Sequence, residues 1–133
     1  MTQARGEFEV KVTPVALDGP AEDAALSRFQ LSKTLTGDFV GEAKGQMLAG
    51  EGTVPTSGVY VAIERLTGRL AGRDGSFLLF HRGVMADGKQ EMLVEIVPDS
   101  GSGALTGIRG TFRIVIEGKK HSYDLEYELP SSR

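Results

Sequence analysis

Hydrophobic and polar residues alternate along much of this chain, which is the pattern of β-strands with one buried face. The clearest apolar rows are Phe8, Val10 and Val12, then Phe29, Leu31 and Leu35, then Tyr123, Leu125, Tyr127 and Leu129. Residues 59–66, 77–85 and 92–97 are apolar at both parities, as in strands that are covered on both faces or lie at a subunit contact. The pattern predicts an all-β protein, and it favours a homo-oligomer, with a dimer as the first choice.

Glycine-containing turns separate these segments and predict antiparallel hairpins. Asp74-Gly75 and Asp87-Gly88 are the predicted hairpin tips, because Asp-Gly pairs favour the type I′ turn. Residues 20–26 are the only helix-like stretch, long enough for a single helical turn or a loop. About eight strands with tight connections predict one domain over residues 1–133, a single antiparallel eight-stranded up-and-down β-barrel. A barrel of this size holds side chains or one small ligand.

Composition narrows the classes of function. The 133 residues suit one domain, and the absence of cysteine excludes disulfides, thiolate metal sites and cysteine nucleophiles. The net charge is −3 and the basic residues are scattered, so we expect no nucleic-acid partner. We also expect no membrane span, a cytoplasmic location, no metal and no cofactor. The 18 glycines include a small-residue row, Gly41, Ala43 and Gly45, which is expected to leave room inside the barrel.

A ten-residue pattern, G-x-L-x-G-x-x-G-[ST]-F, occurs at residues 68–77 and again at residues 103–112. Its glycine spacing differs from that of phosphate-binding loops, and neither copy is expected to open a helix. We interpret each copy as a corner between strands, whose phenylalanine closes the end of the barrel.

This corner resembles the barrel signature that allene oxide cyclases and dirigent proteins share. A closer resemblance spans most of the chain and is to a bacterial family of small uncharacterised proteins assigned the allene-oxide-cyclase-like barrel. It rests on Lys33-Thr34, Gly37-Asp38, residues 64–68, Gly72-Arg73, residues 75–77, His81, Gly83, residues 98–107, Tyr123, Leu125 and Tyr127. The resemblance implies the barrel fold, and it implies no particular activity.

Three polar residues, Lys33, Glu64 and His81, fall on rows that parity places inside the barrel, whereas a fourth, His121, is expected at an exposed rim. Unpaired buried charges are costly, so these three are the candidate catalytic or binding residues. The repeated pattern supports an inward His81, because His81 maps onto Ile116 in a second apolar row. The predicted ligand contacts are apolar or aromatic residues of the inward rows: Tyr60, Phe77, Leu79, Phe29, Leu31, Tyr123 and Tyr127.

Three functions are compatible with these residues. The first is a barrel that binds a small, mostly apolar molecule of fatty-acid or polyketide size. The second is a cofactor-free cyclase or isomerase in which Glu64 and His81 divide the acid and base roles and Lys33 stabilises charge. That reading resembles how allene oxide cyclases and dirigent proteins are understood to act. The third is a filled barrel with a structural or interaction role, in which Lys33 and Glu64 form a buried ion pair.

Overall fold

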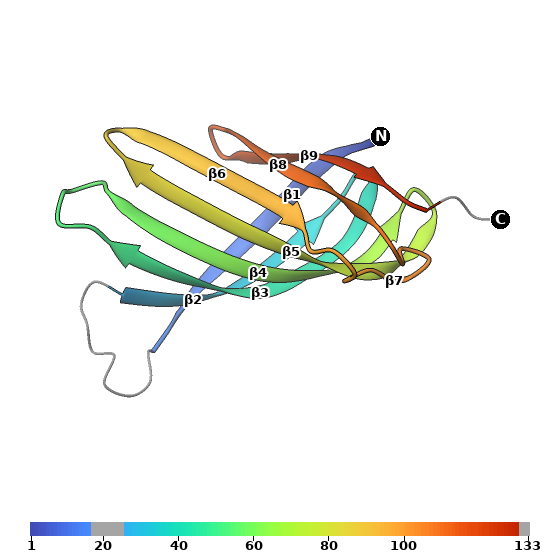
Figure 1. The fold of residues 1–133 in the computed structure, drawn as a ribbon, viewed down its shortest axis with the longest axis horizontal. Coiled ribbons are helices and arrows are strands. Elements are labelled where there is room, and N and C mark those ends of the chain that lie inside the picture. Colours follow the sequence, from blue (N-terminus) through green and yellow to red (C-terminus); the bar gives the residue numbers. More distant parts are fainter. Residues whose placement is uncertain (17–25, 131–133) are drawn as a thin grey trace.

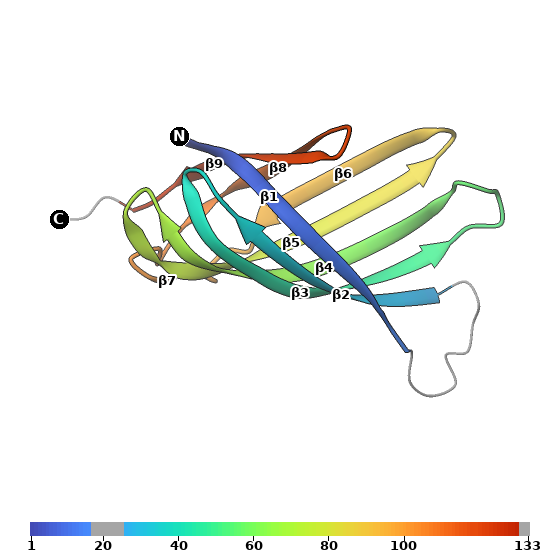
Figure 2. The ribbon, with the colours of Figure 1, turned by 180° about the vertical axis from the view of Figure 1, so that it is seen from behind.

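The fold, taken from a computed structural model that describes residues 1–16 and 26–130, is a sheet of antiparallel strands that closes into a barrel (Figures 1 and 2). The strands are β1 (Thr2–Val15), β2 (Leu26–Leu35), β3 (Phe39–Glu51), β4 (Gly58–Leu70), β5 (Arg73–Ala86), β6 (Lys89–Ile96), β7 (Ser102–Gly103), β8 (Arg109–Glu117) and β9 (Lys120–Glu128). The predicted eight-stranded antiparallel barrel is therefore confirmed, with the two-residue β7 as an addition. The predicted helical turn at residues 20–26 lies outside the described residues except for Leu26, which begins β2.

Strands that follow one another in the chain are neighbours in the barrel, as in an up-and-down meander. Their order is β4-β3-β2-β1-β9-β8-β6-β5, and a further ladder between β4 and β5 closes the sheet. The short β7 pairs with the beginning of β5. The part of the chain that the structure describes contains no helix long and apolar enough to cross a membrane.

One predicted hairpin tip is wrong. The β4–β5 hairpin turns at Ala71-Gly72, where both residues have positive φ angles of 49° and 83°, as a type I′ turn requires. Asp74 instead lies within β5 opposite Arg69, and the Arg69 Nε is 3.0 Å from its Oδ1. The tip at Asp87-Gly88 is confirmed, with φ angles of 54° and 71°.

An apolar core closes one end of the barrel. The loop between β6 and β8 crosses this end and inserts Leu105 and Ile108, whose side chains are completely buried. The two copies of the glycine pattern meet here, and their equivalent residues are buried in the same core: Leu70 and Leu105, Phe77 and Phe112. This placement agrees with the interpretation of each copy as a corner at the barrel end.

The other end is open, and side chains that face the interior become exposed there. Val12 is 47% exposed, Met85 41% and Met92 38%. Ile116 is 57% exposed, although Phe112 of the same row is buried. Parity assigns Ile116 to the inner face, but no opposite wall covers it at this end.

The barrel wall is also split along one side. The ladder between β6 and β8 consists of a single bridge, Glu95 to Thr111, whereas β8 and β9 pair along their whole length. Figure 1 shows the β5–β6 hairpin diverging from the β8–β9 hairpin beyond that bridge. The interior is therefore bounded by a packed end, an open end and a lateral seam.

Candidate functional site

Four polar side chains gather in the middle of the barrel, where the closed core gives way to the open end. Lys33 comes from β2, Glu64 and Tyr60 from β4, and His81 from β5. Lys33 is 7% exposed, Glu64 1% and His81 7%, so the inward placement predicted from parity is correct for all three. The structure thus brings the three candidate residues together and adds the hydroxyl of Tyr60.

Lys33 and Glu64 form a buried ion pair. The Lys33 Nζ is 2.9 Å from the Glu64 Oε1 and donates a hydrogen bond of 3.1 Å to its Oε2. The two residues are separated by β3, which places Ala43 opposite Lys33 and Gly45 opposite Glu64. Because Ala43 has a small side chain and Gly45 has none, Lys33 and Glu64 have space to meet over β3. The room expected from the small-residue row is thus filled by the ion pair.

The environment of the pair is mostly apolar. The Lys33 Nζ lies 5.0 Å from the centre of the Phe8 ring, a cation–π contact that adds to the stabilisation of the ammonium group. The Glu64 Oε1 is close to Lys33 but poorly aligned with it, and it has no hydrogen-bond partner. Glu64 therefore retains the capacity to accept one more hydrogen bond.

Tyr60 and His81 form a second pair on the side of the open end. The Tyr60 hydroxyl is 2.8 Å from the His81 Nε2, and the rings meet edge to face with centroids 5.0 Å apart. Tyr60 lies opposite Gly83, and a Cβ added at Gly83 would overlap the Tyr60 ring. Glycine at this position is what allows the phenol to lie flat across β5 and reach His81.

Both members of this pair are neutral near pH 7. Burial, together with the smaller effect of the nearby ammonium group of Lys33, lowers the pKa of His81 to about 4. Burial raises the pKa of Tyr60, a hydrogen bond from Gln90 opposes that rise, and the charge of Glu64 adds to it. With the ion pair, the four groups carry no net charge.

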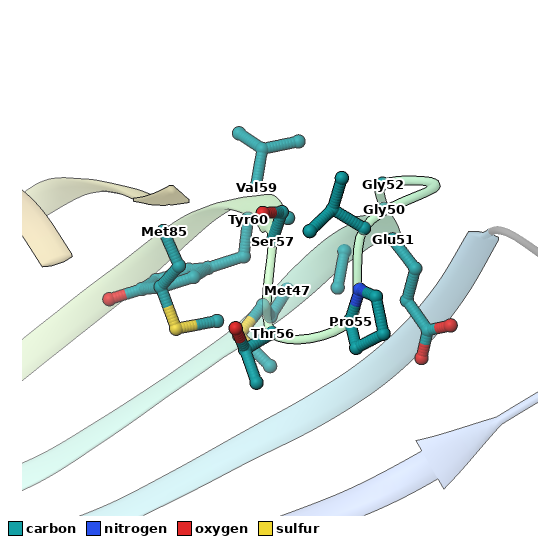
Figure 3. Close-up of a pocket in the computed structure, with 13 residues that line it drawn as sticks. Met47, Gly50, Glu51, Gly52, Pro55, Thr56, Ser57, Val59, Tyr60 and Met85 are labelled. Carbon is teal, nitrogen blue, oxygen red and sulfur yellow. The ribbon is translucent and has the colours of Figure 1, made fainter. Parts of the chain in front are cut away.

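A pocket of about 450 Å³ opens above Tyr60. Met47 of β3, Tyr60 of β4 and Met85 of β5 line its inner side, and the β3–β4 hairpin, including Pro55 and Thr56, lines the other (Figure 3). We call this the mouth pocket. The alternation of residues did not predict that this hairpin lines a pocket, because the hairpin belongs to no alternating segment.

A second hollow of about 340 Å³ lies at the seam between β6 and β8. Its lining includes Gln90 and Met92 from β6 and Phe112 and Ile114 from β8. The side chain of Gln90 also lies close enough to the Tyr60 hydroxyl to lower its pKa. The mouth pocket and the seam hollow therefore approach the same tyrosine from two sides.

The other predicted contacts lie deeper or elsewhere. Phe77 and Leu79 are fully buried in the closed core, Tyr127 is 6% exposed, Leu31 is 8% exposed and Phe29 is partly buried. The Tyr123 hydroxyl accepts a hydrogen bond from the Phe39 amide and donates one to the Thr36 carbonyl. Of the predicted contacts, Tyr60 is the one that lines the mouth pocket.

The chemistry available at this site is that of a buried ion pair and a neutral phenol–imidazole pair. Within residues 1–16 and 26–130, no three histidine, aspartate or glutamate side chains are grouped so that they could hold a metal ion. The arrangement offers hydrogen-bond donors and acceptors without net charge, below a mouth lined by methionine and aromatic carbon.

Comparison with known proteins places the chain in a family. No curated protein matches it. A crystal structure of a protein of unknown function from Shewanella oneidensis MR-1, assigned to the DUF3224 family, is 40% identical, superimposes with a TM-score of 0.91, and the match covers 99% of each chain. The family model described as protein of unknown function (DUF3224) matches residues 4–127. The chain therefore belongs to the DUF3224 family of small β-barrel proteins, for which no function is named.

Proposed function

We propose that this protein binds a small, mostly apolar molecule in the open half of its barrel. The observation that carries the proposal is the row of interior-facing apolar side chains that remain exposed around the mouth pocket. In a filled barrel, Met47, Met85 and Met92 would be covered by side chains of the opposite wall. A concave, largely apolar site with a few convergent polar groups is the usual form of a small-molecule site.

The residues of the mouth suit a ligand of variable shape. Methionine side chains are flexible and polarisable, so Met47 and Met85 adapt to irregular apolar surfaces. A polar group on the ligand would first meet the Tyr60 hydroxyl. The Glu64 Oε1, which contacts Lys33 but has no hydrogen-bond partner, would be the next acceptor beneath it. The resemblance of the two glycine corners to those of allene oxide cyclases also supports a ligand inside the barrel.

The same groups give less support to acid–base catalysis. A general base is most effective when its pKa is near the working pH, whereas the pKa of His81 is about 4. The carboxylate of Glu64 is held by Lys33, which opposes its use in proton transfer. We therefore prefer binding to a cyclase or isomerase reaction.

The test uses the apolar fluorescent probe N-phenyl-1-naphthylamine and a variant that fills the mouth. Ala49 lines the mouth pocket, so Ala49→Trp is expected to weaken probe binding at least tenfold. Val40→Trp is the matched control, because Val40 is a 56% exposed residue of the same strand outside the pocket. Thermal unfolding of both variants checks that the barrel is intact.

Binding to the outside of the barrel must be separated from binding in the mouth. Ile63 lies at the edge of two exposed apolar hollows on the outer face. Ile63→Glu is expected to leave the probe affinity unchanged. Loss of affinity in Ile63→Glu together with full affinity in Ala49→Trp would overturn the proposal. Native mass spectrometry of protein purified from its host would then identify the natural ligand as a co-purifying small molecule.

A further inference from the structure

An apolar patch, interrupted by the exposed Arg82, covers the outside of strands β3 to β6. It consists of Leu48, Val61, Ile63, Leu78, Phe80 and Leu93, which we call the outer patch. Ile63 is 57% exposed, Leu48 45%, Leu93 40%, Val61 39% and Phe80 36%. These residues belong to the segments that are apolar at both parities. Clustered exposed apolar residues of this kind mark interaction sites, whereas apolar residues that are exposed singly are normal on any surface.

We propose that the outer patch is the interface of a two-fold homodimer. This inference is independent of the ligand in the barrel, because the patch faces away from the interior. The shape of the patch and the distribution of charge around it both support this dimer.

The shape of the patch is complementary to itself. Ile63 and Phe80 are cross-strand partners and form a ridge at its centre. A hollow lined by Leu48 and Val61 lies on one side of this ridge, and a hollow lined by Leu78 lies on the other, each about 450 Å³. Under a two-fold axis, the same surface is presented by both copies, so the ridge of each copy can enter a hollow of the other.

The charges that border the patch are separated by sign. Lys44 and Arg65 are cross-strand partners on the β3–β4 side, and Glu91 and Glu95 lie along β6 on the opposite side. A two-fold axis that lays β3 of one copy over β6 of the other brings each basic pair onto an acidic edge. Such complementarity selects the second copy and sets its orientation.

Arg82 is a charged residue within the area of the patch, between Val61 and Leu93. Its diagonal neighbours on β6 are Glu91 and Glu95, so carboxylates of the same copy lie near its charge. Its aliphatic stem adds apolar surface to the patch. Arg82 is therefore compatible with burial of the patch against a second copy.

The first experiment measures mass by light scattering at micromolar concentration. The wild-type protein is expected at twice the chain mass of 14.2 kDa. Ile63→Glu is expected to give the monomer mass without loss of fold, because Ile63 faces outward. Val40→Glu, at an exposed outward position of β3 beyond the patch, is expected to remain a dimer. A monomeric wild type, or a dimer that survives Ile63→Glu, would overturn the proposal.

The second experiment tests the orientation with two charge-swapped chains. Lys44→Glu with Arg65→Glu makes both borders acidic, and Glu91→Lys with Glu95→Lys makes both borders basic. Each double variant alone is expected to be monomeric, and an equimolar mixture is expected to form a heterodimer. Failure of the mixture to associate, with an intact wild-type dimer, would overturn the two-fold arrangement. Neither experiment depends on N-phenyl-1-naphthylamine, so its outcome is separate from that of the proposed function.

Discussion

The closed half and the open half of the barrel each contain a tyrosine that packs over a glycine of the neighbouring strand, but the two hydroxyl groups have different partners. Tyr123 and Tyr60 each lie opposite a glycine on the neighbouring strand, Gly6 and Gly83, and neither glycine has room for a Cβ. In the closed half, the Tyr123 hydroxyl bonds to backbone groups of the β2–β3 turn. In the open half, the Tyr60 hydroxyl bonds to His81, beside an open pocket.

The difference is between a hydroxyl group that stabilises the fold and a hydroxyl group that a ligand can reach. The hydroxyl of Tyr123 accepts a hydrogen bond from the amide of the buried Phe39 and donates one to the Thr36 carbonyl, and a buried amide without a partner is costly. The hydroxyl of Tyr60 has side-chain partners that can rearrange. Substitutions in the closed half should therefore reduce stability, while substitutions in the open half should mainly change binding.

The largest expected effect comes from the ion pair at the boundary of the two halves. Glu64→Gln leaves the ammonium group of Lys33 buried without a counter-ion, and the free energy of unfolding should fall by about 3 to 5 kcal/mol. Urea unfolding measures this loss. The double variant Lys33→Met, Glu64→Leu should recover most of it, because it removes both charges.

An exposed pair of the same chemistry provides the control for Glu64→Gln. The Lys120 Nζ is 2.7 Å from the Glu7 Oε1, but both side chains are more than half exposed. Glu7→Gln should leave the urea midpoint unchanged, because solvent screens this pair. Equal losses for Glu64→Gln and Glu7→Gln would show that the interior pair is hydrated, which contradicts its assignment to a dry boundary.

The next prediction compares the same substitution, glycine to alanine, at Gly6 and at Gly83. The Cβ of Gly6→Ala would overlap the backbone carbonyl of Thr36, which cannot move aside, so we expect a loss of about 3 kcal/mol. The Cβ of Gly83→Ala would overlap the Tyr60 ring, which can swing into the mouth pocket, so we expect about 1 kcal/mol and weaker probe binding. The reverse order of the two losses in urea unfolding would contradict the comparison.

Removing the two hydroxyl groups should give a smaller difference in the same direction. Tyr123→Phe leaves the Phe39 amide and the Thr36 carbonyl without their partner, at a cost of about 2 kcal/mol. Tyr60→Phe breaks its hydrogen bond to His81 in a partly hydrated region, at a cost of about 1 kcal/mol or less. Equal losses would show that the open half is as dry as the closed half.

The last comparison concerns a dependence of stability on pH that arises in the open half. The pKa of His81 in the folded protein is about 4, below its ordinary value of 6.5, so the unfolded chain binds a proton that the folded chain does not. The contribution is complete above pH 6.5 and is lost as the pH falls toward 4, with a slope of at most about 1.4 kcal/mol per pH unit. Wild type and His81→Gln should therefore converge in stability as the pH falls, and parallel curves would contradict this.

The alternation of residues predicted the barrel and the inward side chains, because parity depends only on the pleat of each strand. It correctly placed Lys33, Glu64 and His81 inside. It did not decide which of them meet, because Lys33 and Glu64 lie on strands separated by β3, and their contact depends on register and closure. The ion pair was one of the alternatives that the sequence left open.

Other features depend on tertiary structure and had no local signal. The tip at Ala71-Gly72 contains an alanine with positive φ, while the Asp-Gly pair that favours such a turn lies three residues later. Ile116 is exposed because the seam between β6 and β8 leaves it without an opposite wall, and the sequence of β8 does not reveal that seam. The β3–β4 hairpin lines the mouth pocket, and the alternation of residues does not predict where that hairpin lies.

The most direct test of ligand binding in the open half uses the four methionines as built-in reporters. Met47 and Met85 line the mouth pocket, Met92 lines the seam hollow, and Met1 is a 77% exposed terminal residue. In a titration of ¹³C-methyl-methionine protein with N-phenyl-1-naphthylamine, followed by NMR, we expect the methyl signals of Met47, Met85 and Met92 to shift and that of Met1 to stay in place. Binding of the probe without any shift of Met47 and Met85 would contradict a ligand site in the open half of the barrel.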